Sequence, residues 1–579
     1  MNRLRKTKII CTIGPACDSD TMLRAMVEAG MNVARLNFSH GTHESHKVNV
    51  DRIKKIREEM DTPIALLLDT KGPEVRTGFF PEPVMLEEDS EVIIRHEDID
   101  GDATQFSCSY KDLAKDLHPG SVVLIDDGLV EMHVERIEGQ DVYCRVMNGG
   151  PVSTHKSINL PETELGLPAL TAQDEADLKF AVENDIDFIA ASFIRKPQDV
   201  VDIKRLLKKL GGDNINVIAK IENREGVNNF EEILKVSDGI MVARGDLGVE
   251  IPAHEVPSIQ KRLIHSCYRD GKPCITATQM LDSMIRNPRP TRAEASDVAN
   301  AILDGTSAIM LSGETAAGKY PLEAVAMMDQ IASYTEEQSD YWAAFEQQKI
   351  YTGPSVANAV SHACCLTAKD LKAKAIIAVT HSGRTARLLS RFRPASPIIA
   401  TTVSQKAFYQ LALSWGVIPY IVDEKTNTDD VFEEAKNRAM ETGLVSNGDI
   451  VVISGGTPVG MSGTTNTLKV QNIGRILCHG NAIGEGQLSG ETLIVTDGNI
   501  PERKQEGSYI LVAEKTDNRL INLIKKATAL VVEDQDVNGH AVTVAMALDI
   551  PVVYDCENAT RILKNGAIIT IDCNTGNIS

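Results

Sequence analysis

Two acidic residues and a lysine follow short apolar runs of the sequence and have the chemistry to hold a metal ion beside a phosphate. Lys220 and Glu222 alternate with apolar residues in VIAKIE, and Asp246 follows the run GIMVA. Side chains two positions apart in a strand face the same way, so Lys220 and Glu222 should lie together. Two carboxylates from adjacent strands suit Mg²⁺, which keeps positions open for phosphate and water. The Lys220 ammonium would neutralise charge on a phosphoryl group in transfer.

A second group of oxygen-bearing side chains ends two earlier runs. Asn37, Ser39, Asp69 and Thr70 carry one net negative charge, which matches a monovalent cation better than Mg²⁺. A hydrogen-bonded network at the strand ends is an equal alternative. Arg35 offers a fork for phosphate oxygens, with an ion pair to a nearby carboxylate as its alternative.

The acidic residues also have purely structural interpretations. Asp246 in GDLG could cap the helix that follows it, and Glu222 could be an ordinary loop carboxylate. The metal site is favoured because the elements described next bring both carboxylates to one edge.

Eight apolar runs, each followed by an amphipathic helical pattern, predict how these residues are positioned. The runs are KIICTIG, NVARLNFSH, PIALLLDTKG, DFIAASFI, NVIAKIE, GIMVARGDLG, PCITATQML and SAIMLSGET. Successive strand ends are 24 to 34 residues apart, but Asp69 and Ser192 are separated by 123. Eight βα units close naturally into a barrel whose active site lies at the carboxyl ends of the strands. We therefore expect an α/β protein with a (β/α)8 TIM barrel over residues 1–71 and 170–340.

The long gap predicts an inserted domain over residues 72–169. Its runs EVIIRH, SVVLIDDGLVEMHVERI and DVYCRVM gather β-branched residues between Gly, Asp and Pro turns. This pattern favours a small β-barrel. Because two connections join it to the catalytic end of the larger barrel, we expect a lid that excludes water.

The remaining chain predicts two further α/β domains. Residues 341–474 alternate helical and strand patterns and form an open α/β regulatory domain, which a turn-rich stretch, GNAIGEGQLSG, ends near residue 475. Residues 475–579, with the runs GETLIVTDGNI and ATALVVED, form a small C-terminal α/β domain. Four domains agree with a length of 579 residues at about 150 residues per domain.

Composition excludes several classes of protein. The formal charge of −21 argues against nucleic-acid or anionic-membrane binding. The N-terminal apolar run is too short and polar for a secretory signal, and no run is apolar over the roughly 18 residues that a membrane span needs. The eleven cysteines include no CxxC pattern and are typical of reduced, buried thiols. We expect a cytoplasmic protein with no membrane or nucleic-acid partner.

Seven stretches, in order along the barrel, resemble the pyruvate kinase family. They are NVARLNFSHG, LLLDTKGPEVRTG, ASFIRK, IAKIENREG, MVARGDLGVE, TATQMLDSM and LSGETAAGKYPLEAV. The insert and the third domain also lie where that family has its lid and regulatory domains. The resemblance implies phosphoryl transfer from phosphoenolpyruvate to ADP, giving pyruvate and ATP, with Mg²⁺ and K⁺ as cofactors. It also implies allosteric control and a homotetramer.

The resemblance assigns roles residue by residue. The implied catalytic residues are Lys220, Arg35 and Thr278; the substrate contacts are Arg35, Lys220, Gly245, Asp246 and Thr278; the nucleotide contacts are Arg76, Lys156 and His40; the Mg²⁺ ligands are Glu222 and Asp246; the K⁺ ligands are Asn37, Ser39, Asp69 and Thr70. Glu74 in GPEVRTG resembles the K⁺-dependent members, since those that need no K⁺ tend to have lysine there. Thr278 is a candidate in the proton path to the enolate, although a hydroxyl is too weak an acid to be the sole donor.

The third domain carries a predicted effector site. The strand AIIAVT runs into HSGRTARLL, which places five small or basic residues at a helix N-terminus suited to anions: Thr380, Ser382, Gly383, Arg384 and Thr385. Four glycines between Gly455 and Gly463 lie in a second loop, SGGTPVGMSGTTN. Ordinary turn chemistry is the alternative. The resemblance favours a phosphorylated activator, a sugar phosphate or AMP.

The last hundred residues resemble the extra C-terminal domain of some bacterial pyruvate kinases, which is itself similar to a phosphohistidine domain. His540 occupies the histidine position, but Asn538 and Gly539 replace the usual Thr-Ser pair. A structural or regulatory histidine is therefore favoured over phosphotransfer.

Two other functions compete with this interpretation. Metal-dependent aldolases on related barrels also bind pyruvate enolates through paired carboxylates, but they lack the nucleotide contacts and the long insert. A phosphometabolite sensor without catalysis is disfavoured because no charged residue of the predicted rim is missing.

Overall fold

The structure is a computed structural model that describes residues 4–347, 355–425, 427–446, 449–457, 464–473, 476–496 and 509–579. The chain forms two compact units, one of residues 1–359 and 380–423 and the other of residues 360–379 and 424–579. The predicted boundary at residues 474 and 475 lies outside the described residues.

Eight parallel strands of the first unit close into a barrel, as predicted. In the order of their pairing around it they are β1 (Lys8–Thr12), β2 (Val33–Asn37), β3 (Ala65–Asp69), β13 (Phe188–Ala191), β14 (Asn216–Ile221), β15 (Gly239–Ala243), β16 (Cys274–Ala277) and β17 (Ala308–Leu311). These strands are buried almost throughout, because the barrel interior covers one face and helices cover the other. The apolar runs of the sequence reflect this double burial.

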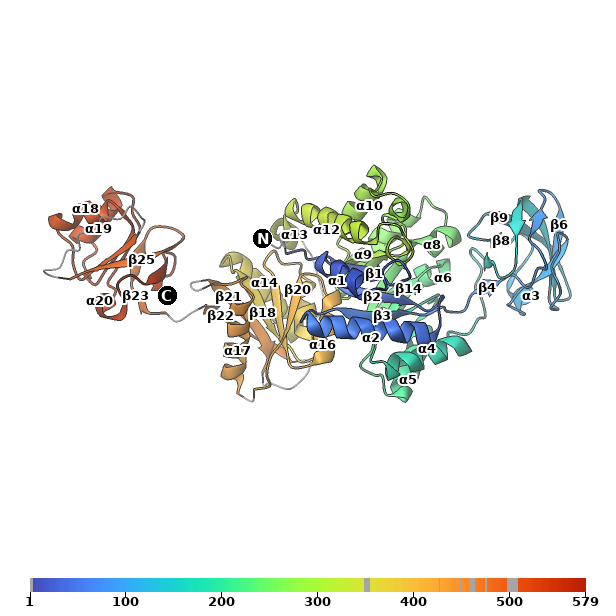
Figure 1. Cartoon of the computed structure of the whole chain (residues 1–579), viewed down its shortest axis with the longest axis horizontal. Helices are drawn as coiled ribbons and strands as arrows, with labels where there is room; N and C mark the ends of the chain where they lie inside the picture. Colours follow the sequence, from blue (N-terminus) through green and yellow to red (C-terminus); the bar gives the residue numbers. More distant parts are fainter. Residues whose placement is uncertain are drawn as a thin grey trace. The chain divides into compact units, whose positions relative to one another are not determined.

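Helices between these strands surround the barrel (Figure 1). They include α1 (Asp20–Glu28), α2 (His43–Glu59), α4 (Ala172–Glu183), α5 (Pro197–Leu210), α7 (Phe230–Val236), α9 (Val256–Asp270), α10 (Arg292–Leu303) and α12 (Pro321–Glu337). Thr42, Thr171 and Thr291 begin α2, α4 and α10 with capping boxes, which satisfy free backbone N–H groups. Helix α5 buries Val200, Ile203 and Leu207 at helical spacing, so its apolar face packs on the sheet.

Gly14, just after β1, allows a close approach of two backbone segments. A Cβ at this position would lie 2.6 Å from the carbonyl oxygen of Ala316 in α11 (Gly313–Ala316). Gly14→Ala is therefore expected to destabilise the barrel by about 1–3 kcal/mol, measured by urea unfolding. The matched control is Gly248→Ala, in α8 (Arg244–Glu250), where nothing lies within 4 Å of the added Cβ. This control should be neutral or stabilising by up to about 1 kcal/mol, and equal losses in both variants would contradict the packing argument.

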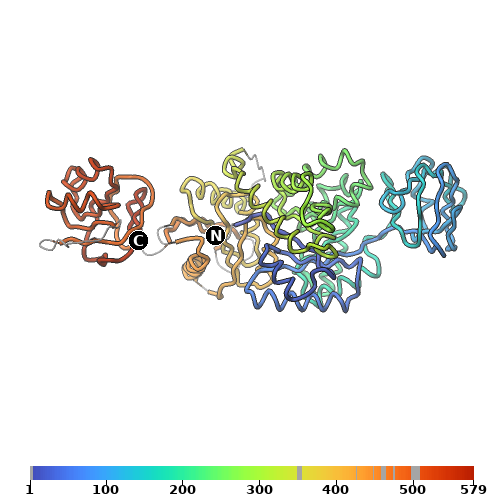
Figure 2. The backbone as a smooth tube through the Cα atoms, turned by 45° about the horizontal axis from the view of Figure 1, so that its top comes forward, coloured from blue at the N-terminus to red at the C-terminus, as the bar shows by residue number. Residues whose placement is uncertain are grey.

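The insert folds as a β structure (Figure 1), and the backbone trace shows it between the segments that form β3 and α4 (Figure 2). Its elements are β4 (Val75–Arg76), β5 (Val84–Leu86), β6 (Glu91–Arg95), β7 (Gln105–Ser107), α3 (Leu113–Asp116), β8 (Val122–Ile125), β9 (Val130–Glu138), β10 (Asp141–Asn148), β11 (Gly150–Val152) and β12 (Ser157–Asn159). Seven of the strands form one sheet with β4 and β7 at its edges. A bridge from Thr77 to Cys108 joins these edges. The sheet therefore curls back on itself, in agreement with the predicted β-barrel.

The predicted regulatory segment alternates helices and strands. They are α13 (Tyr341–Gln347), α14 (Val356–Asp370), β18 (Ala375–Val379), α15 (Arg384–Ser390), β19 (Ile398–Thr402), α16 (Gln405–Gln410), β20 (Val417–Ile421), α17 (Thr428–Glu441), β21 (Ile450–Gly456) and β22 (Thr465–Asn472). In the first unit, β19 and β20 pair in parallel. In the second unit, β18 pairs in parallel with β21, and β22 pairs antiparallel with it.

The C-terminal segment of the second unit forms an eight-stranded sheet. Its strands, in sheet order, are β23 (Cys478–His479), β30 (Asn577–Ile578), β29 (Ile568–Asp572), β25 (Gln487–Val495), β26 (Tyr509–Ala513), β27 (Ala527–Val532), β28 (Val552–Tyr554) and β24 (Asn481–Ile483). The prediction that GNAIGEGQLSG is a turn-rich terminator is wrong. This stretch contains β24 and the start of β25, which pair antiparallel with β28 and β29 from a distant part of the chain.

All eleven cysteines are buried, as predicted, and none of them is in a disulfide bond. None of the helices in the described part of the chain has both the length and the apolar character of a membrane span.

Candidate active site

Lys220 lies at the centre of a polar cluster where the barrel strands end. Its Nζ lies 2.9 Å from Glu222 Oε1 and 3.1 Å from Asp69 Oδ1, and it donates to Ser192 Oγ at 2.7 Å. Burial alone would lower the pKa of Lys220, but the carboxylates of Asp69 and Glu222 outweigh it and hold the pKa above its usual value. The ammonium is therefore charged at neutral pH, and the predicted alignment of Lys220 with Glu222 is observed.

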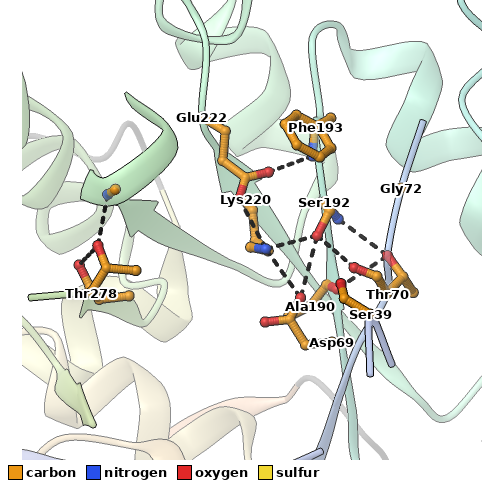
Figure 3. A network of polar contacts seen from close by, with 12 residues as sticks. Ser39, Asp69, Thr70, Gly72, Ala190, Ser192, Phe193, Lys220, Glu222 and Thr278 are labelled. Carbon is orange, nitrogen blue, oxygen red and sulfur yellow. Dashed lines mark hydrogen bonds and ion pairs between the residues drawn. The ribbon is translucent and has the colours of Figure 1, made fainter. Parts of the chain in front are cut away.

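Glu222 lies buried between this lysine and the backbone of Phe193. Its Oε2 accepts a hydrogen bond from Phe193 N at 2.6 Å, while Oε1 faces Lys220 (Figure 3). Burial raises the pKa of Glu222 to about 7, opposed by Lys220 and reinforced by the negative charge of Asp246. Glu222 is buried and Asp246 is partly exposed, and two carboxylates that repel each other are a donor set that a divalent cation would stabilise. The chemistry of this pair therefore fits Mg²⁺.

Asp246 lies in the first turn of α8, not at the end of a strand. The strand β15 ends at Ala243, and α8 begins at Arg244 without a side-chain cap. The N-cap residue is Ala243, so the capping interpretation of Asp246 is not supported. The short connection brings this carboxylate close enough to raise the pKa of both Lys220 and Glu222.

Arg35 forms the ion pair that was its structural alternative. Its Nε donates to Asp69 Oδ2 at 2.7 Å, and its Nη1 donates to Thr12 Oγ1 at 2.9 Å. Burial would raise the pKa of Asp69, but Arg35 and Lys220 hold it below its usual value. Asp69 therefore fixes both cations of the rim in place.

The other oxygen-bearing residues at the ends of β2 and β3 take part in local hydrogen bonds. Asn37 is the register partner of Asp69, and its Oδ1 accepts from Ser39 N at 3.2 Å. Thr70 Oγ1 accepts from Ser192 N at 3.2 Å. These contacts match the interpretation of a hydrogen-bonded network at the strand ends. The side chains also lie at adjoining strand ends, which a site for a monovalent cation requires.

Ser192 is a central residue that the sequence analysis did not select. It links Lys220, Asp69 and Thr70 through its hydroxyl, which donates to Thr70 O at 2.6 Å (Figure 3). The available signal was its position directly after the buried strand β13, as Thr70 follows β3 and Glu222 follows β14.

Thr278 has a strained backbone that the surrounding contacts maintain. Its φ is +66°, which is unfavourable for a β-branched residue. Its Oγ1 accepts from Gly245 N at 2.7 Å and donates to Ala277 O at 2.6 Å. Arg244 donates to the Thr278 carbonyl at 2.7 Å and pairs with Asp297. Strain of this kind gathers at functional sites, and here it fixes the Thr278 hydroxyl beside Gly245.

A cavity of about 490 Å³ lies between the insert and the barrel rim. Arg76, Lys156 and Asp246 all line it. Arg76 pairs with Glu74 at 2.6 Å, and Lys156 pairs with Asp126 at 2.8 Å. His40, which was assigned to the same nucleotide site, is exposed and does not line this cavity.

The predicted effector residues surround the start of α15. Thr380, Ser382 and Gly383 precede this helix, and Gly383 has a left-handed φ of +79°. Arg387 donates to Ser382 O at 2.8 Å. Arg384 and Thr385 form the first turn of the helix. In the second loop, Gly455 and Gly456 end β21, and residues 458–463 lie outside the described residues.

His540 begins α19 (His540–Ala547) in the C-terminal sheet domain. Both ring nitrogens have partners, with Nδ1 at 2.8 Å from Thr516 Oγ1 and Nε2 at 3.2 Å from Asn518 Oδ1. The ring is thus held by two side chains, which agrees with a structural or regulatory histidine.

The fold and its charged rim define an enzyme of the (β/α)8-barrel class with an inserted domain. Residues 4–325 match the family described as pyruvate kinase, barrel domain, and residues 358–471 match the pyruvate kinase alpha/beta domain. Residues 505–576 match the mobile domain of PEP-utilising enzymes.

Full-length relatives and a solved structure agree with these matches. The chain is 46% identical to a pyruvate kinase of Staphylococcus haemolyticus and 45% identical to one of Staphylococcus aureus strain MRSA252, over 99% of each chain. A crystal structure of a pyruvate kinase from Cryptosporidium parvum is similar with a TM-score of 0.78 and 38% identity, covering 81% of this chain and 97% of that one. This chain belongs to the pyruvate kinase family and is a phosphotransferase of glycolysis.

Proposed function

We propose that this enzyme transfers the phosphoryl group of phosphoenolpyruvate to ADP, giving pyruvate and ATP, at the rim around Lys220. The observation that carries the proposal is the buried Lys220 ammonium, held between Asp69, Glu222 and Ser192. A fixed positive charge of this kind stabilises the negative charge that spreads over a phosphoryl group in transfer. Glu222 and Asp246 would hold Mg²⁺, which would supply Lewis-acid neutralisation of the phosphate oxygens.

The residues of the chain have distinct tasks in this proposal. Lys220 orients the transferred phosphoryl group and neutralises its charge. Arg35 and Lys220 both contact Asp69, so the guanidinium of Arg35 adds a second positive charge beside that of Lys220. Arg76 and Lys156, which line the cavity under the insert, bind the phosphates of ADP. The insert excludes water, so that transfer to ADP is favoured over hydrolysis.

A coupled assay with lactate dehydrogenase tests this function directly. With the purified enzyme, lactate dehydrogenase should oxidise NADH only when phosphoenolpyruvate, ADP and Mg²⁺ are all present. Absence of turnover with every candidate activator would favour a phosphometabolite sensor. Absence of ADP-dependent turnover together with pyruvate release by carbon–carbon cleavage of an aldol adduct would favour the aldolase class.

We also propose that K⁺ activates the enzyme. Asn37, Ser39, Asp69 and Thr70 gather oxygens of low total charge at the ends of β2 and β3, which suits a monovalent cation. Replacing K⁺ by tetramethylammonium at constant chloride should lower kcat by about 10-fold or more, because the large ion cannot replace the missing charge. Equal rates without K⁺ would contradict both this assignment and the one for Glu74.

Thr278 is proposed to lie on the proton path to the enolate. Thr278→Val removes the hydroxyl with little change of shape and is expected to lower kcat by about 100-fold, measured with phosphoenolpyruvate at saturation. The matched control Thr278→Ser keeps the hydroxyl and relieves the β-branch at φ +66°, so it should keep most of the activity. Equal losses in the two variants would show that the methyl group, and not the hydroxyl, matters.

Regulation and assembly complete the proposal. The turn before α15, with Thr380, Ser382, Gly383, Arg384 and Thr385, would bind a sugar phosphate or AMP. Activation by either effector that is lost in Arg384→Gln would support this effector site.

We further propose a cytoplasmic homotetramer. The mass of the enzyme in solution tests this assembly.

A further inference from the structure

A small cavity lined by three arginines lies at the opposite end of the barrel from the proposed active site. Its volume is about 20 Å³, and its lining includes Tyr268, Ser307, Arg387, Arg391, Arg393 and Trp415. Ser307 directly precedes β17, so the cavity lies near the amino ends of the strands. No carboxylate is present among the lining residues.

Arg393 is one of the two buried arginines of this cavity. It is 7% exposed, and its Nη2 donates to Gly305 O at 2.8 Å and to Ser307 Oγ at 3.1 Å. Its Nε and Nη1 have no hydrogen-bond partner. The guanidinium carbon lies 4.4 Å from the ring centre of Trp415, which stabilises the charge without accepting those N–H groups. Two buried donors of this residue therefore remain unsatisfied, which is costly.

Arg391 adds a third unsatisfied donor near the same cavity. It is also 7% exposed, its Nε has no partner, and its Nη1 reaches Asn358 Oδ1 only at 3.4 Å. The nearest acidic group that acts on it, Asp270, already pairs with Arg269 at 2.9 Å. Burial lowers the pKa of Arg393 to about 10 and also lowers the pKa of Arg391. Positive charge is thus concentrated around the cavity and is only partly offset by Glu336, whose carboxylate acts on Arg393 and accepts from Lys6 N and Thr7 N.

The donors and the size of the cavity define the ligand. The unpartnered groups are all N–H donors, and Ser390 Oγ, which could have donated, already bonds to Trp415 O at 2.6 Å. Water needs acceptors as well as donors, whereas a halide only accepts. A volume of about 20 Å³ is enough for one particle of the size of a water molecule.

We propose that this cavity, lined by Arg387, Arg391 and Arg393, binds a single chloride-sized anion that neutralises the buried guanidinium groups. The anion stabilises the packing of residues 387–415 under the barrel. The proposal is independent of the chemistry proposed at the catalytic rim.

Bromide identifies such a site directly, because it replaces chloride and scatters anomalously. Crystals of the full-length enzyme grown in sodium bromide should give an anomalous peak within hydrogen-bond distance of Arg393 Nη1 and Arg391 Nε. A peak elsewhere only, a water in the cavity, or a side chain of another subunit in it would overturn the proposal.

Thermal unfolding gives an independent test in solution. At constant ionic strength, replacing gluconate by chloride should raise the transition temperature of the wild-type enzyme by about 3 °C and then saturate. The response should be lost in Arg393→Gln and kept in Arg205→Gln, whose exposed side chain pairs with Asp202 on α5. If Arg393→Gln does not fold, Arg391→Gln takes its place, and the crystal experiment needs no variant. An equal chloride response in the cavity variant and in the control would refute the site.

Discussion

Lys220→Met is expected to lower kcat by about 1,000-fold or more while phosphoenolpyruvate still binds. The substitution removes the only ammonium that contacts both Asp69 and Glu222 among the described residues. That charge acts mainly when negative charge spreads over the transferred group, so its loss should appear in kcat and not in KM. Steady-state kinetics and calorimetric titration of phosphoenolpyruvate measure the two effects separately.

The fold of this variant is expected to survive, since the carboxylates keep other partners. Asp69 retains Arg35 at 2.7 Å, and Glu222 retains the Phe193 N–H at 2.6 Å. The matched control is Lys179→Met, whose side chain is 65% exposed on α4 and pairs weakly with Glu183 at 3.8 Å. If kcat of Lys220→Met falls by less than about 10-fold, Lys220 does not stabilise the proposed phosphoryl transfer.

Glu222→Gln is expected to raise the Mg²⁺ concentration needed for half-maximal activity by about 100-fold. The amide keeps the shape of the side chain and an oxygen for the Phe193 N–H, but it removes the negative charge that a hard cation requires. Because activity and binding can fail separately, Mn²⁺ binding to the substrate-free enzyme should be measured by electron paramagnetic resonance.

Glu183→Gln is the control for this substitution, because Glu183 is 61% exposed at the end of α4. Its Mg²⁺ activation should match that of the wild-type enzyme. If Glu222→Gln binds Mn²⁺ with unchanged affinity, the metal does not lie between Glu222 and Asp246.

Local sequence rules predicted the barrel and much of its rim because the information is nearly all local. The runs around Arg35, Asp69 and Lys220 are apolar and short, and these polar residues lie within the strands β2, β3 and β14. Alternation alone placed Lys220 and Glu222 on one face, and the contact of 2.9 Å confirms it. The inserted domain was evident from a single break in the spacing.

Non-local pairing explains what the sequence patterns did not predict. The stretch around Asn481 and Gln487 has the composition of turns, but it forms strands because Val552 and Ile568 lie far along the chain and provide their pairing partners. Ser192 was overlooked for the same reason, because its importance comes from contacts with Thr70 and Lys220 on two other strands. A hydroxyl in a sequence gives no sign of which groups it will join.

The sequence by itself determined the eight βα units, the place of the insert and the set of residues available at the rim, since strand periodicity and helix caps depend on near neighbours. Only the tertiary structure decided how those residues share their charges. Arg35 was free to bind phosphate or to pair with an acid, and the closed barrel brings it to Asp69, which also holds Lys220. Charge pairing depends on distances through space, and the order of residues along the chain does not contain these distances.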